Sequence, residues 1–106
     1  MGKVRPLKNI RVKVQYFGLL KNTLGCEEEQ FLLLEGSSVK DILDLMSEKH
    51  GEQFTSMVFR GDGSLRRLVQ VMVDGDNIRD GNGLNAMLDD GHEISLTVGI
   101  YAIAGG

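Results

Sequence analysis

The sequence has little of several features that mark whole classes of protein. It contains one cysteine, one proline and no tryptophan among its 106 residues. A single cysteine, Cys26, excludes disulfide bonds within the chain, so we expect a reducing compartment such as the cytoplasm. No apolar run approaches the roughly 20 residues that a transmembrane helix requires, and the basic start lacks the apolar stretch of a signal peptide. We therefore expect no membrane association.

The charged residues are nearly balanced but unevenly distributed. There are 12 Lys plus Arg against 15 Asp plus Glu, giving a formal net charge of −3, so we expect no binding to nucleic acid. Basic residues dominate the stretch before Glu27, and acidic residues dominate residues 74–93. Two interpretations are open: two solvated faces of opposite sign, or a charged docking surface for a protein partner.

Motifs of catalysis and cofactor binding are also lacking. Residues 81–86, GNGLNA, match the dinucleotide-binding pattern, but the Asp-Asp-Gly at 89–91 would end a helix after about one turn, so we interpret these glycines as turn residues. Cys26, His50 and His92 share no spacing typical of zinc sites. Three glutamates follow Cys26 and should raise the pKa of its thiol. We predict a protein with no enzymatic active site, no cofactor and no metal.

Four segments have the composition of β-strands. Residues 10–16 alternate apolar and polar side chains, the pattern of a half-buried strand. Residues 30–35 form a second apolar segment, which can pair with the first across a connection of roughly a dozen residues. Residues 68–73 are rich in β-branched side chains, and the turn Asp90-Gly91 precedes the last predicted strand, 93–98.

One helix is predicted over residues 39–50. Ser38 is a good N-cap, Asp41 can complete a capping box, and Gly51 suits the C-terminal end. The apolar stripe of this helix comprises Val39, Ile42, Leu43 and Met46. Residues 52–59 are expected to form at most a short helical turn. Core contacts in the irregular segment after residue 73 are expected from Ile78, Leu84, Met87 and Leu88.

The order strand, strand, helix, strand, strand predicts an α+β fold. A single amphipathic helix needs a sheet face to cover, and two flanking hairpins supply it. We therefore predict a ubiquitin-like β-grasp roll, with the first and last strands side by side in a mixed sheet. The alternative, a split-βαβ sandwich, requires a second helix. The predicted organisation is a flexible leader (1–9), a β-grasp domain (10–99) and a mobile tail (100–106).

Two glycines, Gly105 and Gly106, close the sequence after a short apolar segment. Because glycine has no Cβ, such an end can pass through a narrow channel and bring its carboxylate to a nucleotide held by another enzyme. A carboxylate is a poor electrophile, so it must first be activated, for example as an acyl-adenylate. The simpler interpretation is a frayed end.

These features resemble the MoaD/ThiS sulfur carrier family. The resemblance covers about residues 10–106 and is carried by the element order, the turn Asp90-Gly91-x-Glu93-Ile94 and the terminal Ala104-Gly105-Gly106. It implies that a ubiquitin-activating-type partner adenylates the C-terminal glycine, which is then converted to a thiocarboxylate. A second partner enzyme would take the sulfur for a small-molecule precursor.

The resemblance also assigns roles to individual residues. Gly106 would carry the sulfur and Gly105 would provide clearance. Ile103 and Ala104 would lie inside the partner's channel. Phe17, at the end of the first strand, matches a position where the molybdopterin-type proteins carry an aromatic residue that packs against the partner.

Within the family, the features divide between branches. Chain length favours the small subunit of molybdopterin synthase, whose large subunit would then be a partner. However, Ile100-Tyr-Ala-Ile103 stands where that branch typically has Pro-Pro, and the closing Ile-Ala-Gly-Gly resembles the thiamine type. We predict a non-enzymatic sulfur carrier in molybdenum cofactor biosynthesis. The alternatives are a thiamine-type carrier, a ubiquitin-like modifier joined to lysines, and an interaction module with an inert tail.

Overall fold

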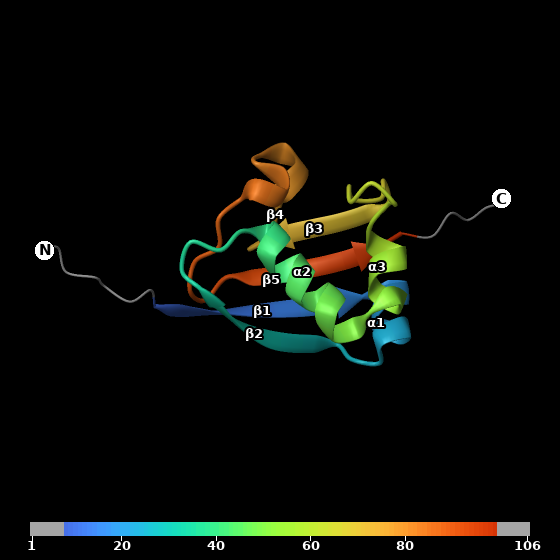
Figure 1. The fold of residues 1–106 in the computed structure, drawn as a ribbon, viewed down its shortest axis with the longest axis horizontal. Coiled ribbons are helices and arrows are strands. Elements are labelled where there is room, and N and C mark those ends of the chain that lie inside the picture. Colours follow the sequence, from blue (N-terminus) through green and yellow to red (C-terminus); the bar gives the residue numbers. More distant parts are fainter. Residues whose placement is uncertain (1–7, 100–106) are drawn as a thin grey trace, which may run out of the picture.

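The computed structural model describes residues 8–99 and is built around one mixed five-stranded sheet (Figure 1). In spatial order, its strands are β2 (Glu28–Leu34), β1 (Asn9–Phe17), β5 (Glu93–Val98), β3 (Val69–Val73) and β4 (Asp76–Asn77). The predicted leader and tail fall mainly on residues 1–7 and 100–106, which lie outside the described residues.

The first and last strands lie side by side in the middle of the sheet. β1 pairs with β5 in parallel and with β2 antiparallel, while β3 pairs antiparallel with both β5 and β4. This is the β-grasp arrangement, which confirms the predicted fold class and makes the split-βαβ alternative wrong. All four predicted strands are present, and the two-residue strand β4 was not predicted.

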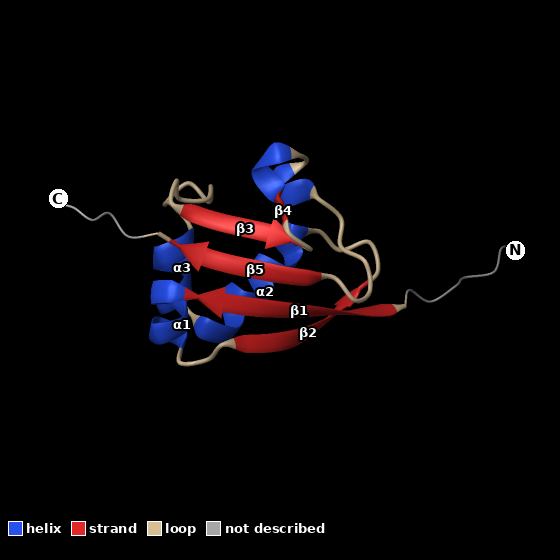
Figure 2. Cartoon of the chain, turned by 180° about the vertical axis from the view of Figure 1, so that it is seen from behind, coloured by secondary structure: helices blue, strands red, loops and turns tan. Residues whose placement is uncertain are grey.

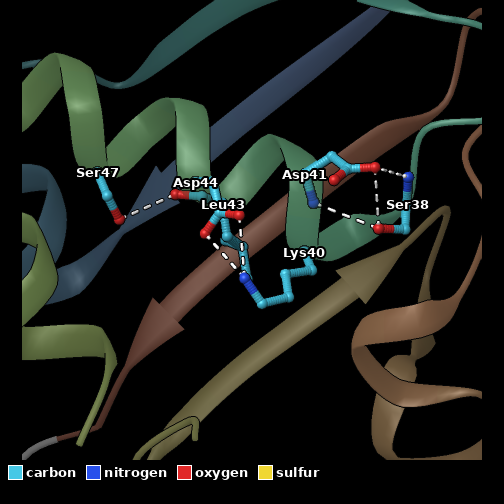
Figure 3. A network of polar contacts seen from close by, with 6 residues as sticks. All are labelled: Ser38, Lys40, Asp41, Leu43, Asp44 and Ser47. Carbon is cyan, nitrogen blue, oxygen red and sulfur yellow. Dashed lines mark hydrogen bonds and ion pairs between the residues drawn. The ribbon is translucent and has the colours of Figure 1, made fainter. Parts of the chain in front are cut away.

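The helix α2 (Val39–His50) crosses one face of the sheet and supplies much of the core. Ser38 caps it as predicted: its hydroxyl oxygen accepts from the Asp41 backbone N–H at 3.3 Å, and the Asp41 carboxylate accepts from the Ser38 backbone N–H at 2.8 Å (Figure 3). The four residues of the predicted stripe, Val39, Ile42, Leu43 and Met46, are all fully buried. A capping box of this kind stabilises a helix by about 1 kcal/mol.

The connection between the first two strands contains a helix that was not predicted, α1 (Gly18–Leu24). Seven residues are too few to show a helical repeat of apolar side chains, and only Leu20 among them is fully buried. Gly18, with φ of +62°, lets the chain turn from β1 into the helix without a linker. Gly25, in the left-handed region, ends it.

Other short elements complete the fold. The expected turn at 52–59 is the helix α3 (Glu52–Val58), and residues 78–86 form two 3₁₀ turns, η1 (Ile78–Asp80) and η2 (Gly83–Asn85), rather than a nucleotide-binding helix. Of the expected core contacts in this part, Ile78 and Leu88 are buried and Leu84 packs against the core. The expectation for Met87 was wrong, because its side chain is 64% exposed.

The helices lie on one face of the sheet, and among the described residues no helix covers the other face (Figure 2). Because β1 pairs with β5, the basic first strand lies beside the acidic segment before β5. Lys13 Nζ is 3.9 Å from both Glu28 and Glu93 carboxylates, and the Arg11 backbone N–H donates to Asp90 at 2.8 Å. Among the described residues, the basic first strand and the acidic segment before β5 are therefore in contact.

Candidate functional site

The end of β5 fixes the point from which the tail departs. Val98 forms a parallel bridge with Gly18, and the Gly99 backbone N–H donates to the Leu68 carbonyl at 2.9 Å. A Cβ added at Gly99 would lie 3.4 Å from both the Cβ and the carbonyl oxygen of Leu68, so the two backbones are in close contact. The end of β5 is therefore anchored on both sides, at Val98 by Gly18 and at Gly99 by Leu68. We call this place the tail root.

An open groove of about 500 Å³ lies beside the tail root. Its lining combines apolar side chains with three arginines and consists of Met57, Arg60, Arg66, Arg67, Leu68, Val69, Val98 and Gly99. The guanidinium of Arg66 is held by a hydrogen bond from Nε to the Ser56 carbonyl at 2.9 Å. Residues 60–67 have no feature in the sequence that predicts this groove, because the pairing of β3 with β5 that brings them to the tail root is a tertiary feature.

Phe17 lies at the same end of the sheet, paired with Thr97 of β5. Its side chain is 44% exposed, and Leu19, two residues later, is 42% exposed. The predicted role of Phe17 in partner binding requires an exposed aromatic ring next to the tail root, and the fold supplies one. Leu19 was not singled out from the sequence, because its exposure depends on how the unpredicted helix α1 packs.

The other predicted site residues, Ile103, Ala104, Gly105 and Gly106, lie outside the described residues. Among residues 8–99, no helix is both long enough and apolar enough to span a bilayer.

A network of polar side chains surrounds the carboxylate of Glu29, on β2. We call it the Glu29 cluster; its members are Tyr16, Cys26, Glu29, Lys49 and His50. The Glu29 Oε2 atom accepts from the Tyr16 hydroxyl at 2.7 Å, lies 2.5 Å from His50 Nε2 and is 3.7 Å from Cys26 Sγ. Lys49 forms an ion pair with Oε1. The carboxylate is therefore shared between the first strand, the turn before β2 and the C-terminal end of α2.

The cluster changes the acidity of its members. Burial by itself would raise the pKa of Glu29, but hydrogen bonds from Lys49, Tyr16 and His50 outweigh burial and lower this pKa to about 2. Burial and the neighbouring Glu29 raise the pKa of the Tyr16 hydroxyl and of the Cys26 thiol. The predicted direction for Cys26 is confirmed, although burial is the larger cause and Glu29 is the one of the three glutamates that contributes.

The fold brings together two candidate metal ligands that the sequence separates. Ligand atoms of Cys26, Glu29 and His50 all lie within 4.8 Å of one another. His92, the third candidate, is elsewhere and lies 3.6 Å from the Asp74 carboxylate. The prediction against a metal was based on spacing along the chain, which carries no signal for this grouping because His50 is far from Cys26 in sequence.

Comparison with known proteins places the chain in a family. The model of the ThiS family matches residues 14–106, whereas a search of curated proteins gives no match. Small archaeal modifier protein 1 from Methanosarcina acetivorans is 26% identical with a TM-score of 0.73, and the match covers 93% of this chain and 99% of that chain. The putative molybdopterin converting factor, subunit 1, from Pyrococcus furiosus is 26% identical with a TM-score of 0.68, over 86% of this chain and 99% of that chain.

A chain of the BexX/CysO complex from Amycolatopsis orientalis is also similar, at 25% identity and a TM-score of 0.65, with 90% of this chain and 99% of that chain covered. The fold, the family match over nearly the whole chain and these relatives agree with one another. This chain therefore belongs to the ThiS family, the small ThiS/MoaD-like proteins of ubiquitin fold that serve as sulfur carriers or modifiers.

Proposed function

We propose that this protein is a sulfur carrier whose reactive group is the carboxyl group of Gly106. The observation that carries the proposal is the family match, which extends through Gly105 and Gly106. The tail root supports it, because a carrier needs a reactive end attached to a base that does not move. Seven residues follow Gly99 and span at most about 25 Å when fully extended, which is enough to reach well into a partner's active site.

The chemistry takes place in partner enzymes and proceeds in two steps. In an adenylating enzyme of the ubiquitin-activating type, an oxygen of the Gly106 carboxylate attacks the α-phosphorus of ATP and releases pyrophosphate. A hydrosulfide ion then attacks the acyl carbon of the adenylate and displaces AMP, leaving a thiocarboxylate. Glycine at both terminal positions leaves the reacting carbon free of side-chain obstruction. This protein itself contributes no catalytic group.

Phe17 and Leu19 are the proposed contacts with the partner. Two exposed apolar side chains beside the tail root would be covered when a partner receives the tail, and aromatic side chains often dominate the energetics of such interfaces. The relative within the BexX/CysO complex supports recognition by a partner protein.

The acceptor we propose is a molybdopterin precursor, with the large subunit of molybdopterin synthase as the second partner. The support is the similarity to the putative molybdopterin converting factor subunit of Pyrococcus furiosus, together with the chain length. A second candidate function is protein modification, in which a lysine amine attacks the activated glycine. This second function is favoured by the similarity to small archaeal modifier protein 1 of Methanosarcina acetivorans, whose sequence identity to this chain is also 26%.

Intact-protein mass spectrometry tests the carrier function. The chain is produced together with its adenylating enzyme and a sulfur source, and we expect the mass increase of replacing one oxygen by sulfur. Gly105→Val should greatly reduce the increase, whereas Gly61→Val, at a loop glycine with open space around its Cβ position, should not. An unchanged mass with both partners active would contradict the proposal. Lysines of other proteins that bear a Gly-Gly remnant after digestion with a protease that cleaves after Ala104 would instead identify a modifier.

A further inference from the structure

We propose that Cys26, Glu29 and His50 form a binding site for a divalent cation of the zinc class. The proposal does not depend on the sulfur carrier function. One sulfur, one nitrogen and one oxygen ligand converge from three elements: the turn before β2, the strand β2 and the last residue of α2. Thiolate and imidazole ligands favour zinc and similar ions over calcium or magnesium, which prefer oxygen.

All three ligand atoms lie within 4.8 Å of one another, and two of their separations can be compared with a tetrahedral site. With zinc–ligand bonds of about 2.0 to 2.3 Å, tetrahedral geometry requires ligand atoms about 3.3 to 3.5 Å apart. Cys26 Sγ and Glu29 Oε2 are 3.7 Å apart, so they would move little. His50 Nε2 and Glu29 Oε2 are 2.5 Å apart, which is a hydrogen-bond distance. To admit the ion, these two atoms would have to move apart by about 1 Å.

The surroundings hold two of the three ligands, Glu29 and His50, in place. The Glu29 and His50 side chains are only 8% and 11% exposed. The Tyr16 ring packs edge-on against the His50 ring at 6.0 Å between centroids, and Phe54 flanks the same imidazole at 6.4 Å. The Tyr16 hydroxyl donates to Glu29 Oε2, an outer interaction of the kind that orients metal-binding carboxylates. Ordering the ligands on binding would therefore cost little conformational entropy.

The charges and protons also balance. A doubly charged cation with one thiolate and one carboxylate forms a neutral centre, and a neutral imidazole and a water complete four ligands. The Cys26 thiol releases its proton to solvent on binding. His50 Nε2 gives up any hydrogen it carries, and the neutral imidazole keeps one on Nδ1. Because a proton is released, affinity should increase as pH rises.

The competing interpretation is a hydrogen-bonded network that needs no ion. In that case the five side chains of the cluster only form hydrogen bonds and ion pairs with one another, and Lys49 supplies the positive charge beside Glu29. The two interpretations differ in what happens when a metal is offered, and Cys26, the chain's only cysteine, provides a direct spectroscopic probe.

Titration of the untagged full chain with Co²⁺ makes this test. We expect a thiolate-to-cobalt charge-transfer band that saturates at one equivalent and disappears when Zn²⁺ is added. Since the chain has one cysteine, the band can arise only at Cys26. His50→Gln should weaken binding by about 100-fold or more, beyond what loss of an outer partner costs, whereas His92→Gln, the matched control, should leave it unchanged. Lys49→Gln should strengthen binding, because it removes a positive charge beside the ion.

The absence of a saturable charge-transfer band in the wild-type chain would overturn the proposal. So would a band whose affinity is the same in His50→Gln, since the thiol would then bind cobalt alone. Circular dichroism without metal establishes that the variants are folded. If His50→Gln does not fold, the ligand-field bands of cobalt in the wild type decide the question: the intense bands of tetrahedral coordination support the site, and the weak bands of octahedral coordination contradict it.

Discussion

The tail root and the Glu29 cluster lie near the same end of β1 but are built in opposite ways. At the tail root, a strand bridge anchors Val98 and a backbone hydrogen bond anchors Gly99, and exposed apolar side chains stand beside them. At the Glu29 cluster, side chains from separate elements bind one nearly buried carboxylate. Under the proposed function the first region presents groups to a partner, whereas the second joins α2 to the sheet. Changes at the tail root should therefore affect activity without stability, and changes in the cluster should affect stability without activity.

Deleting Gly106 should have the largest effect. If sulfur acceptance survives the deletion, the assignment of activity to the tail is wrong. We expect complete loss of thiocarboxylate formation, because the reacting carboxyl group would move to Gly105 and stop one residue short. Intact mass spectrometry measures the product, and thermal unfolding should give an unchanged melting temperature. A truncated chain that still accepts sulfur would place the reactive group elsewhere.

Glu29→Gln tests the other region and should cost about 3 kcal/mol of unfolding free energy at neutral pH, since a pKa unit corresponds to about 1.36 kcal/mol. The pKa of Glu29 is lowered to about 2 from an ordinary value of 4.5. The folded state thus binds fewer protons than the unfolded state, so this stabilisation is present above pH 4.5 and is lost as pH falls toward 2.

Denaturant unfolding at several pH values measures this contribution. The wild type should lose stability between pH 4.5 and 2 more steeply than Glu29→Gln, so that the two chains converge at the acidic end. Parallel curves would mean that the cluster contributes nothing through its ionisation. Sulfur acceptance by the folded variant at neutral pH should remain as in the wild type.

Phe17→Ser should weaken partner binding by about 30-fold, corresponding to roughly 2 kcal/mol for an aromatic contact, while the unfolding free energy changes by less than about 0.5 kcal/mol. Calorimetric binding to the adenylating enzyme measures the first quantity. Leu32→Ser is the matched control, because Leu32 is 61% exposed and lies on β2, away from the tail root. Equal loss in both variants would remove Phe17 from the interface.

Ser38→Ala should have the smallest effect and calibrates the comparison. Loss of the capping hydroxyl at the other end of α2 should cost about 1 kcal/mol, independent of pH between 4.5 and 7 and without effect on sulfur acceptance. A stability loss as large as that of Glu29→Gln would mean that α2 is held as strongly by its start as by the cluster at its end.

Patterns that repeat within one element were readable from the sequence. The strand at 93–98 and the helix at 39–50 have the bounds that alternation and capping predict, since each depends on residues close together in the chain. Given the order of strands and helix, few folds let a single helix cover one face of the sheet, so the β-grasp fold could be predicted.

Helix α1 and the exposure of Met87 could not be predicted from the sequence. Seven residues are too few for a helix to form on its own, so α1 exists because Leu20 is buried against the rest of the core. Met87 is apolar like the core residues, but in the fold it follows η2 and its side chain is exposed to solvent. In both cases, packing between elements overrides local preference.

The sequence by itself determined the β-grasp, the family resemblance and the candidate reactive end, because these depend on local periodicity, on order and on a terminal motif. Only the tertiary structure decided that Cys26, Glu29 and His50 meet, that residues 60–67 border the tail root and that the basic and acidic segments lie side by side. The reason is physical: strand pairing and helix docking join positions far apart in the chain, and the spacing of residues along the sequence contains no record of those contacts.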